Sequence, residues 1–229
     1  VIIKHGLKEI AWSKGKSVTF MAKYDHRKAG SSSHVHQSLW TLDGKAAFYD
    51  PADEHGMSQL MKHYMAGQLA YARDMTVFMA PYVNSYKRYT IGMFAPTKAV
   101  WSADNRTAGF RVCGLHSKAI RVECRIGGAD LNPYLAFAAE IAAGLAGIEA
   151  DLELGPEFTG DAYAGARLPG IPTTLRDATE ALRRSEMLRA AFGDSILIRL
   201  SLATTVAGFT MVSLSTSFEM SALGFAIVG

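Results

Sequence analysis

The segment Ile120-Arg-Val-Glu-Cys-Arg-Ile126 alternates charged and apolar side chains, a pattern typical of a β-strand with one face against a core. The three charged side chains then share one face, and the apolar ones share the other. Two interpretations are equally open. The strand carries an exposed set of ion pairs of little energetic value, or it presents Glu123 to a divalent cation and Arg121 and Arg125 to phosphate oxygens.

A second strand is predicted toward the N-terminus, in His34-Val-His-Gln-Ser-Leu-Trp40. Its period of two places His34, His36 and Ser38 on one face, so two imidazoles point into one space. That arrangement suits a metal ligand at His34 and an anion donor at His36. Ordinary surface or core histidines remain the alternative for such a pair. Alternation from Lys16 onward predicts a further strand before a small-residue loop at 28–33.

Basic side chains gather between and around these segments, within 38 residues of each other. They are Arg88, Arg106, Arg111, Lys118, Arg121 and Arg125. Burying so many cations is costly unless anions meet them, and nucleotide phosphate together with a carboxylate substrate would do so. The chain lacks a phosphate-binding P-loop, because the glycine that would precede Gly15-Lys16-Ser17 is replaced by Ile10.

Helical periodicity appears in three places outside the strands. Residues 58–80 predict a core-packing helix interrupted near Gly67, and Asn132-Pro133 is expected to open a long apolar helix over 134–154. Thr173 or Thr174 is expected to cap another helix that continues to residue 192.

The composition of the 229 residues excludes disorder and collagen-like structure. Lys and Arg number 24 against 21 Asp and Glu, a net charge of +3, so we expect no nucleic-acid partner. Cys113 and Cys124 are expected to be small core residues and not part of a disulfide framework. The N-terminal sequence does not resemble a secretory signal, so we expect a cytoplasmic protein with no membrane partner.

Residues 195–229 contain only two charged side chains, Arg199 and Glu219. This loss of charge admits three interpretations: buried strands, a membrane helix over 200–218, or a non-native tail produced by a shifted reading frame.

Taken in order, five motifs resemble the catalytic domain of glutamine synthetase, in particular its type III-like branch and relatives that make γ-glutamyl amides. The motifs are GSSSHVHQSLW, NSYKR, NRTAGFR, KAIRVECR and ADLNPYLAFAAEIAAGLAGIE. The resemblance implies an α+β, glutamine synthetase/guanidino kinase-like fold, with a curved antiparallel sheet and helices packed outside it. Residues 1–194 would form a partial catalytic domain, and 195–229 an atypical apolar tail that we interpret as frame-shifted.

The resemblance also implies an activity. ATP would phosphorylate the γ-carboxylate of glutamate, and ammonia or a small amine would displace phosphate from the γ-glutamyl phosphate. ATP and Mg²⁺ or Mn²⁺ are the implied cofactors, and a homo-oligomer is the assembly usual in the family. Phosphoryl transfer depends mainly on positioning and on neutralising charge, which suits a site rich in cations.

Individual residues take roles from the same resemblance. The metal ligands it implies are His34 and Glu123. The residues it implies for the nucleotide are His36, Ser38, Arg106, Arg111, Lys118 and Arg121. Those it implies for the amino-acid substrate are Gly30, Arg88, Phe94 and Arg125. Of all these, Arg88, Arg106 and Arg125 are expected to act in catalysis.

Two departures from the family pattern concern the substrates. Phe94 stands where the family has a glutamate that helps to deprotonate ammonium, and a phenyl ring cannot act as that base. We therefore expect an acceptor bulkier than ammonium, such as an alkylamine or polyamine. Ala29 stands where a glutamate-binding asparagine is usual.

A third departure is that most of the family's metal-binding glutamates lie on upstream strands that this sequence does not contain. Divalent ions of this type need several oxygen ligands, so we expect the chain alone to bind Mg²⁺ weakly and to be inactive. A non-catalytic nucleotide- or phosphate-binding fragment is the alternative. A creatine-kinase-like phosphotransferase is a second alternative, but it would not need the metal-binding strand that contains His34.

Overall fold

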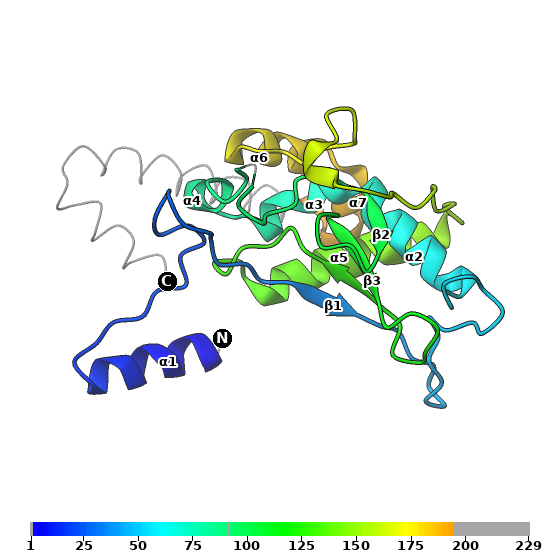
Figure 1. Ribbon diagram of the computed structural model, residues 1–229, viewed down its shortest axis with the longest axis horizontal. Coiled ribbons are helices and arrows are strands. Elements are labelled where there is room, and N and C mark those ends of the chain that lie inside the picture. The colour runs from blue at the N-terminus through cyan, green and yellow to red at the C-terminus, as the bar shows by residue number, and fades with distance from the viewer. Residues whose placement is uncertain (1, 91, 195–229) are drawn as a thin grey trace.

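The computed structural model describes residues 2–90 and 92–194 of the chain (Figure 1). Four short strands form one sheet in the order β1-β4-β3-β2. The strands are β1 (Val35–Gln37), β2 (Trp101–Ala103), β3 (Phe110–Cys113) and β4 (Arg121–Cys124). Strand β4 pairs antiparallel with both β1 and β3, so the strand predicted over 120–126 lies inside the sheet.

The sheet differs from the expected antiparallel sheet at one of its three pairings, because β2 runs parallel to β3. The chain leaves β2 through a loop that begins at Asp104, where φ is +53°. The loop returns beside the start of β2 instead of forming a hairpin. There Gly109 N donates to Lys98 O over 3.2 Å and Phe110 N donates to Val100 O over 3.1 Å.

Helices account for most of the remaining regular structure. They are α1 (Ile2–Ser13), α2 (Gln59–Ala70), α3 (Ala72–Met79), α4 (Val83–Tyr86), α5 (Pro133–Glu149), the 3₁₀ helix η1 (Ala162–Ala164), α6 (Leu175–Arg184) and α7 (Glu186–Phe192). Helices α2 and α5 pack against each other behind the sheet, and α3 contacts both α5 and α6 (Figure 1). One apolar core joins helices α2 to α7 to the inner face of the sheet.

Helices α2 and α5 approach closely because glycines lie where they cross. A Cβ on Gly67 would lie 2.7 Å from Gly147 Cα, and a Cβ on Gly144 would overlap the ring of Tyr64. Side chains larger than hydrogen would therefore push the two helices apart. The close approach brings α2 and α5 side chains to the same part of the sheet.

Two helix starts agree with the sequence prediction. Asn132 Oδ1 accepts from Tyr134 N over 3.0 Å, and Pro133 occupies the first helical position of α5. At α6, Thr174 Oγ1 accepts from Asp177 N over 3.1 Å. Of the two threonines proposed as caps, Thr174 is the one that acts.

Two predicted helices are divided. The break in 58–80 falls at Tyr71 between α2 and α3, and Gly67 lies within α2. The helix expected to continue to residue 192 breaks at Ser185, whose hydroxyl accepts from Leu188 N over 3.2 Å and so caps α7. A local side-chain bond replaces the continuous helical ladder at that point.

The strand expected from Lys16 onward does not form. The backbone of Lys23 instead pairs with the side chain of Asn84, which accepts from Lys23 N over 2.9 Å and donates to Lys23 O over 2.8 Å. The side-chain amide of Asn84 supplies the hydrogen bonds that a neighbouring strand would otherwise provide. The backbone at Lys23 is therefore satisfied without β-sheet pairing.

Helix α1 was not expected from the sequence, and none of its residues is buried. Lys4 attaches it to the body by donating to Ala129 O over 2.7 Å and Leu131 O over 3.0 Å. Among the residues that the structure describes, no helix has the length and apolar character needed to span a bilayer. The interpretations of 195–229 fall outside the described residues.

Candidate functional site

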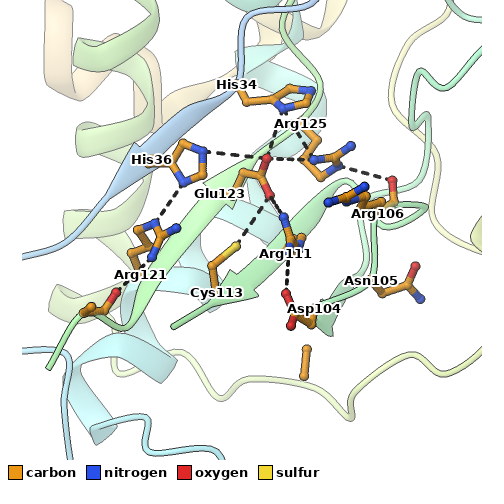
Figure 2. A network of polar contacts seen from close by, with 12 residues as sticks. His34, His36, Asp104, Asn105, Arg106, Arg111, Cys113, Arg121, Glu123 and Arg125 are labelled. Atoms are coloured by element: carbon orange, nitrogen blue, oxygen red, sulfur yellow. Dashed lines mark hydrogen bonds and ion pairs between the residues drawn. The ribbon is translucent and has the colours of Figure 1, made fainter. Parts of the chain in front are cut away.

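Glu123 lies at the centre of the candidate site because of the sheet register. On β4 it is paired with His36 of β1 on one side and Arg111 of β3 on the other. Residues directly opposite one another in a ladder point to the same face. Arg125 follows Glu123 by two positions and reaches the same face, so side chains from three parts of the chain converge on one carboxylate (Figure 2).

Both oxygens of this carboxylate are engaged. Oε1 lies 2.7 Å from Arg125 Nη1, 3.0 Å from His34 Nδ1 and 3.7 Å from His36 Nε2. Oε2 lies 3.0 Å from Arg111 Nη1 and 3.5 Å from Cys113 Sγ.

Glu123 is only 3% exposed, so the interpretation of this strand as a set of exposed ion pairs is wrong. A buried carboxylate needs such partners, since without them its negative charge would be both unpaired and shielded from water.

Burial and the neighbouring cations set the protonation of the site. Burial would raise the pKa of Glu123, but Arg125 and Arg111 outweigh it and the pKa lies below its ordinary value. Burial, followed by the charge of Arg125, lowers the pKa of His34. Burial also lowers the pKa of His36. At neutral pH the site therefore holds an ionised carboxylate and two neutral imidazoles with lone pairs.

We call Glu123 and the side chains around it, His34, His36, Arg111, Cys113 and Arg125, the cluster. Further contacts extend this cluster at both ends. Arg121 Nε donates to His36 Nδ1 over 3.1 Å, and Arg111 Nη2 donates to Asp104 Oδ1. Arg125 Nε donates to the backbone oxygen of Arg106 over 3.2 Å. Arg106 thus contributes its backbone to the network, and its own side chain is exposed.

Arg88 and Gly30 form a second group next to this cluster. Arg88 is 2% exposed, and its Nη1 donates to Ile126 O over 3.0 Å. A Cβ on Gly30 would lie 2.6 Å from Arg88 Cγ and 2.5 Å from Ala22 O. Only glycine fits there, so the loop before β1 lies directly against the arginine. The charge of Arg88 is also close enough to help lower the pKa of His34.

Three predicted site residues lie apart from the network around Glu123. Ser38 accepts from Trp40 Nε1 over 3.2 Å, while Lys118 and Phe94 are exposed. Within 2–90 and 92–194, neither Lys118 nor Phe94 makes a hydrogen bond or ion pair with the cluster (Figure 2). Phe94 has a φ of +58° and is 73% exposed, so its ring projects from a loop.

Sequence reasoning missed three residues of functional interest. Cys113 was expected to be an ordinary core residue, but it points to the same face as Arg111, and the alternation in Phe110–Cys113 is a signal that could have placed it there. Asp104 lies on a loop with no such signal. Glu140 is fully buried in α5, where it interrupts an otherwise apolar run of sequence.

The residue types at His34 and Glu123 fit a hard divalent ion, because an ionised carboxylate and a neutral imidazole can both donate lone pairs. They supply only two ligands. No group of three or more metal-binding side chains occurs among the described residues. Any ion held here would need further oxygen ligands from phosphates, water or residues outside this sequence.

Comparison with known proteins agrees with this geometry. The family model for the glutamine synthetase catalytic domain matches residues 1–201. The chain belongs to the glutamine synthetase catalytic-domain family. This confirms the family inferred from the five motifs, and the family's relatives are named as ligases.

Among relatives, γ-glutamylethanolamide synthetase GlnA4 of Streptomyces coelicolor is 45% identical over 95% of this chain and 47% of its own length. Glutamate–isopropylamine ligase of a Pseudomonas species is 40% identical over 84% of this chain and 42% of its own length. Glutamine synthetase of Thermus thermophilus is 40% identical over 83% of this chain and 44% of its own length. The chain therefore spans less than half the length of these relatives.

Solved structures support the α+β fold. The structure titled "Apo GmaS without ligand" aligns with a TM-score of 0.84 at 29% identity, covering 96% of this chain and 50% of the other. The one titled "GmaS/ADP complex-Conformation 1" aligns with a TM-score of 0.80 at 29% identity, covering 89% of this chain and 48% of the other.

Proposed function

We propose that the chain forms the nucleotide- and phosphate-binding part of an ATP-dependent ligase that joins the γ-carboxyl of glutamate to an amine through γ-glutamyl phosphate. The observation that carries the proposal is the convergence of two guanidiniums and two neutral imidazoles on the buried carboxylate of Glu123. Family membership and relatives named as glutamate–amine ligases support it.

The cations act by holding phosphate oxygens in place and by stabilising negative charge during transfer. Arg111 and Arg125 are fixed by Glu123, so their guanidiniums do not have to reorganise when charge develops nearby. Each guanidinium keeps N–H groups beyond these contacts that can donate charge-assisted hydrogen bonds to phosphate oxygens. Burial strengthens these interactions because water screens them less.

Metal binding is proposed at the same carboxylate, next to Arg125. His34 and Glu123 would hold a Mg²⁺ or Mn²⁺ ion together with ATP, and the bound ion would neutralise charge on the phosphate oxygens. Both residues retain the required ionisation at neutral pH, which supports the assignment.

Glutamate is proposed to lie against Gly30 and Arg88. The absence of a side chain at Gly30 lets its loop lie directly against Arg88, and the guanidinium of Arg88 supplies a buried positive charge for a carboxylate. In this proposal the loop at Gly30, before His34, contacts glutamate, and the strand that contains His36, after His34, contacts the nucleotide.

For the amine we propose an acceptor with an alkyl part. The exposed ring of Phe94 offers apolar surface and no base. One relative named for a γ-glutamylethanolamide product and another named for isopropylamine as its amine support an amine larger than ammonia. In a polypeptide that completes this chain to the length of its relatives, rates with ethylamine should exceed those with ammonium. Phe94→Glu should shift the preference toward ammonium, and a clear ammonium preference in the unchanged protein would contradict the assignment.

Calorimetric titration of the chain with Mg·ADP tests the nucleotide part. Binding should be measurable, and Arg111→Ala should weaken it about tenfold through the loss of one charge-assisted contact. Arg176→Ala on α6 is a matched control, because Arg176 makes no contact with the cluster among the described residues. A polypeptide completed to the length of its relatives that binds nucleotide but forms no ADP from ATP in the presence of glutamate and amine would favour the non-catalytic alternative, and absence of binding would overturn both.

A further inference from the structure

A buried polar network lies on the face of the sheet opposite the site. Gln37 follows His36 on β1 and therefore points to the other face. Its Nε2 donates to Glu140 Oε2 of α5. Its Oε1 accepts from Tyr64 Oη over 2.5 Å and from Gln68 Nε2 over 2.9 Å, both on α2. The amide of Gln37 is thus held by two helices.

Gln37 connects this network to the site through the backbone of β1. Its neighbour His36 points to the site face, where its Nε2 lies 3.7 Å from Oε1 of Glu123 on β4. The hydrogen bond from Gln37 to Glu140 therefore ties the strand that carries His36 to helix α5.

Strand β1 has a particular need for such an anchor. It is three residues long, lies at the edge of the sheet and is paired only with β4. Few ladder hydrogen bonds hold a strand of this length. A small shift of β1 relative to β4 would change the distances from both imidazoles to Glu123.

We propose that Glu140 is a positioning residue for the candidate site: through Gln37 it fixes β1 against α5 and so sets the placement of His34 and His36 beside Glu123. The expected effect on nucleotide binding rests on the proposed function, in which His34 contacts the metal ion and His36 contacts the nucleotide. Glu140 itself lies behind the sheet and touches no substrate.

The protonation of Glu140 suits this role. Burial raises its pKa to about 8, so the carboxyl is mostly neutral at pH 7 and acts as a hydrogen-bonding group without a charge. Gln is then a close substitute in shape and hydrogen bonding, whereas Leu fills similar space and cannot accept from Gln37. These two replacements separate hydrogen bonding from packing.

The first measurement uses the full chain without ligand. Imidazole nitrogen–proton NMR spectra should show the His34 and His36 signals displaced in Glu140→Leu and restored to their original positions in Glu140→Gln. The signal of His55, which is paired with Glu157 away from the site, is the internal reference. Glu149→Leu on the exposed end of α5 is the matched control and should leave all three signals unchanged.

The second measurement is Mg·ADP affinity in the same variants. We expect Glu140→Leu to weaken binding at least fivefold while Glu140→Gln stays within twofold of the original chain. Unmoved His34 and His36 signals in a folded Glu140→Leu chain would overturn the positioning role. So would equal displacement of His55, because it would indicate general loosening. Displaced signals in a protein that never binds nucleotide would instead overturn the proposed function and leave the positioning role intact.

Discussion

The buried carboxyl of Glu140 should make the stability of the chain depend on pH. Glu140 is 0% exposed, and burial raises its pKa from the ordinary 4.5 to about 8. Between these two values the folded chain keeps a proton that the unfolded chain releases. Because the unfolded state binds fewer protons there, the free energy of unfolding falls as pH rises. Below pH 4.5 both states are protonated and this contribution to the pH dependence vanishes.

The size of the effect follows from the two pKa values. Each pH unit between them lowers the free energy of unfolding by about 1.4 kcal/mol, so the complete loss above pH 8 is about 5 kcal/mol. A domain is usually stable by only about 5–15 kcal/mol. One side chain would therefore account for much of the stability margin at alkaline pH.

Glu140→Gln removes the titrating group while keeping a neutral hydrogen-bonding side chain. Urea unfolding, followed by circular dichroism at pH 5, 7 and 9, gives the free energy of unfolding of both chains. The original chain should lose about 3 kcal/mol relative to Glu140→Gln between pH 5 and 7. Glu149→Gln, exposed on the same helix, should follow the original chain. Parallel curves for the original chain and Glu140→Gln would refute the reasoning.

Three other substitutions test the site and the packing by urea unfolding at pH 7. Glu123→Ala should lower the free energy of unfolding by about 3 kcal/mol or more, because it leaves the buried guanidinium of Arg125 without a carboxylate partner; no loss would show that water already hydrogen-bonds to this guanidinium. Gly67→Ala should lower it by about 1–3 kcal/mol, since the added Cβ would lie 2.7 Å from Gly147 Cα, and a loss below about 0.5 kcal/mol would mean that α2 and α5 separate freely. Asn132→Ala should lower it by about 1 kcal/mol by removing the cap of α5, whereas an unchanged value would mean that other contacts hold the helix start.

Local patterns were sufficient for several elements and for the clustering of His34, His36, Arg111 and Arg125 around Glu123. The alternation around Glu123 predicts a strand with its charges on one face, because side chains of a strand alternate whatever its neighbours are. The Asn132-Pro133 pair predicts the start of α5, since a cap bonds to backbone only a few residues away. The five ordered motifs identified the family, which the family model confirms.

Features that depend on distant neighbours could not be predicted in this way. Local alternation from Lys16 onward indicated a strand, but the side chain of Asn84 takes the backbone of Lys23 and no ladder forms. The parallel pairing of β2 and β3 depends on how the loop from Asp104 returns, which no short-range pattern records. Likewise, the break at Ser185 results from a hydroxyl that caps the following helix.

The sequence by itself determined that the chain is a glutamine synthetase family domain and predicted the charged side chains that surround Glu123. Only the tertiary structure decided that Glu123 is buried between His36 and Arg111, and that Glu140 contacts Gln37 of β1 from behind the sheet. The physical reason is that periodicity assigns a side chain to a face, whereas burial, partners and pKa depend on the strand register and on which helix packs against that face.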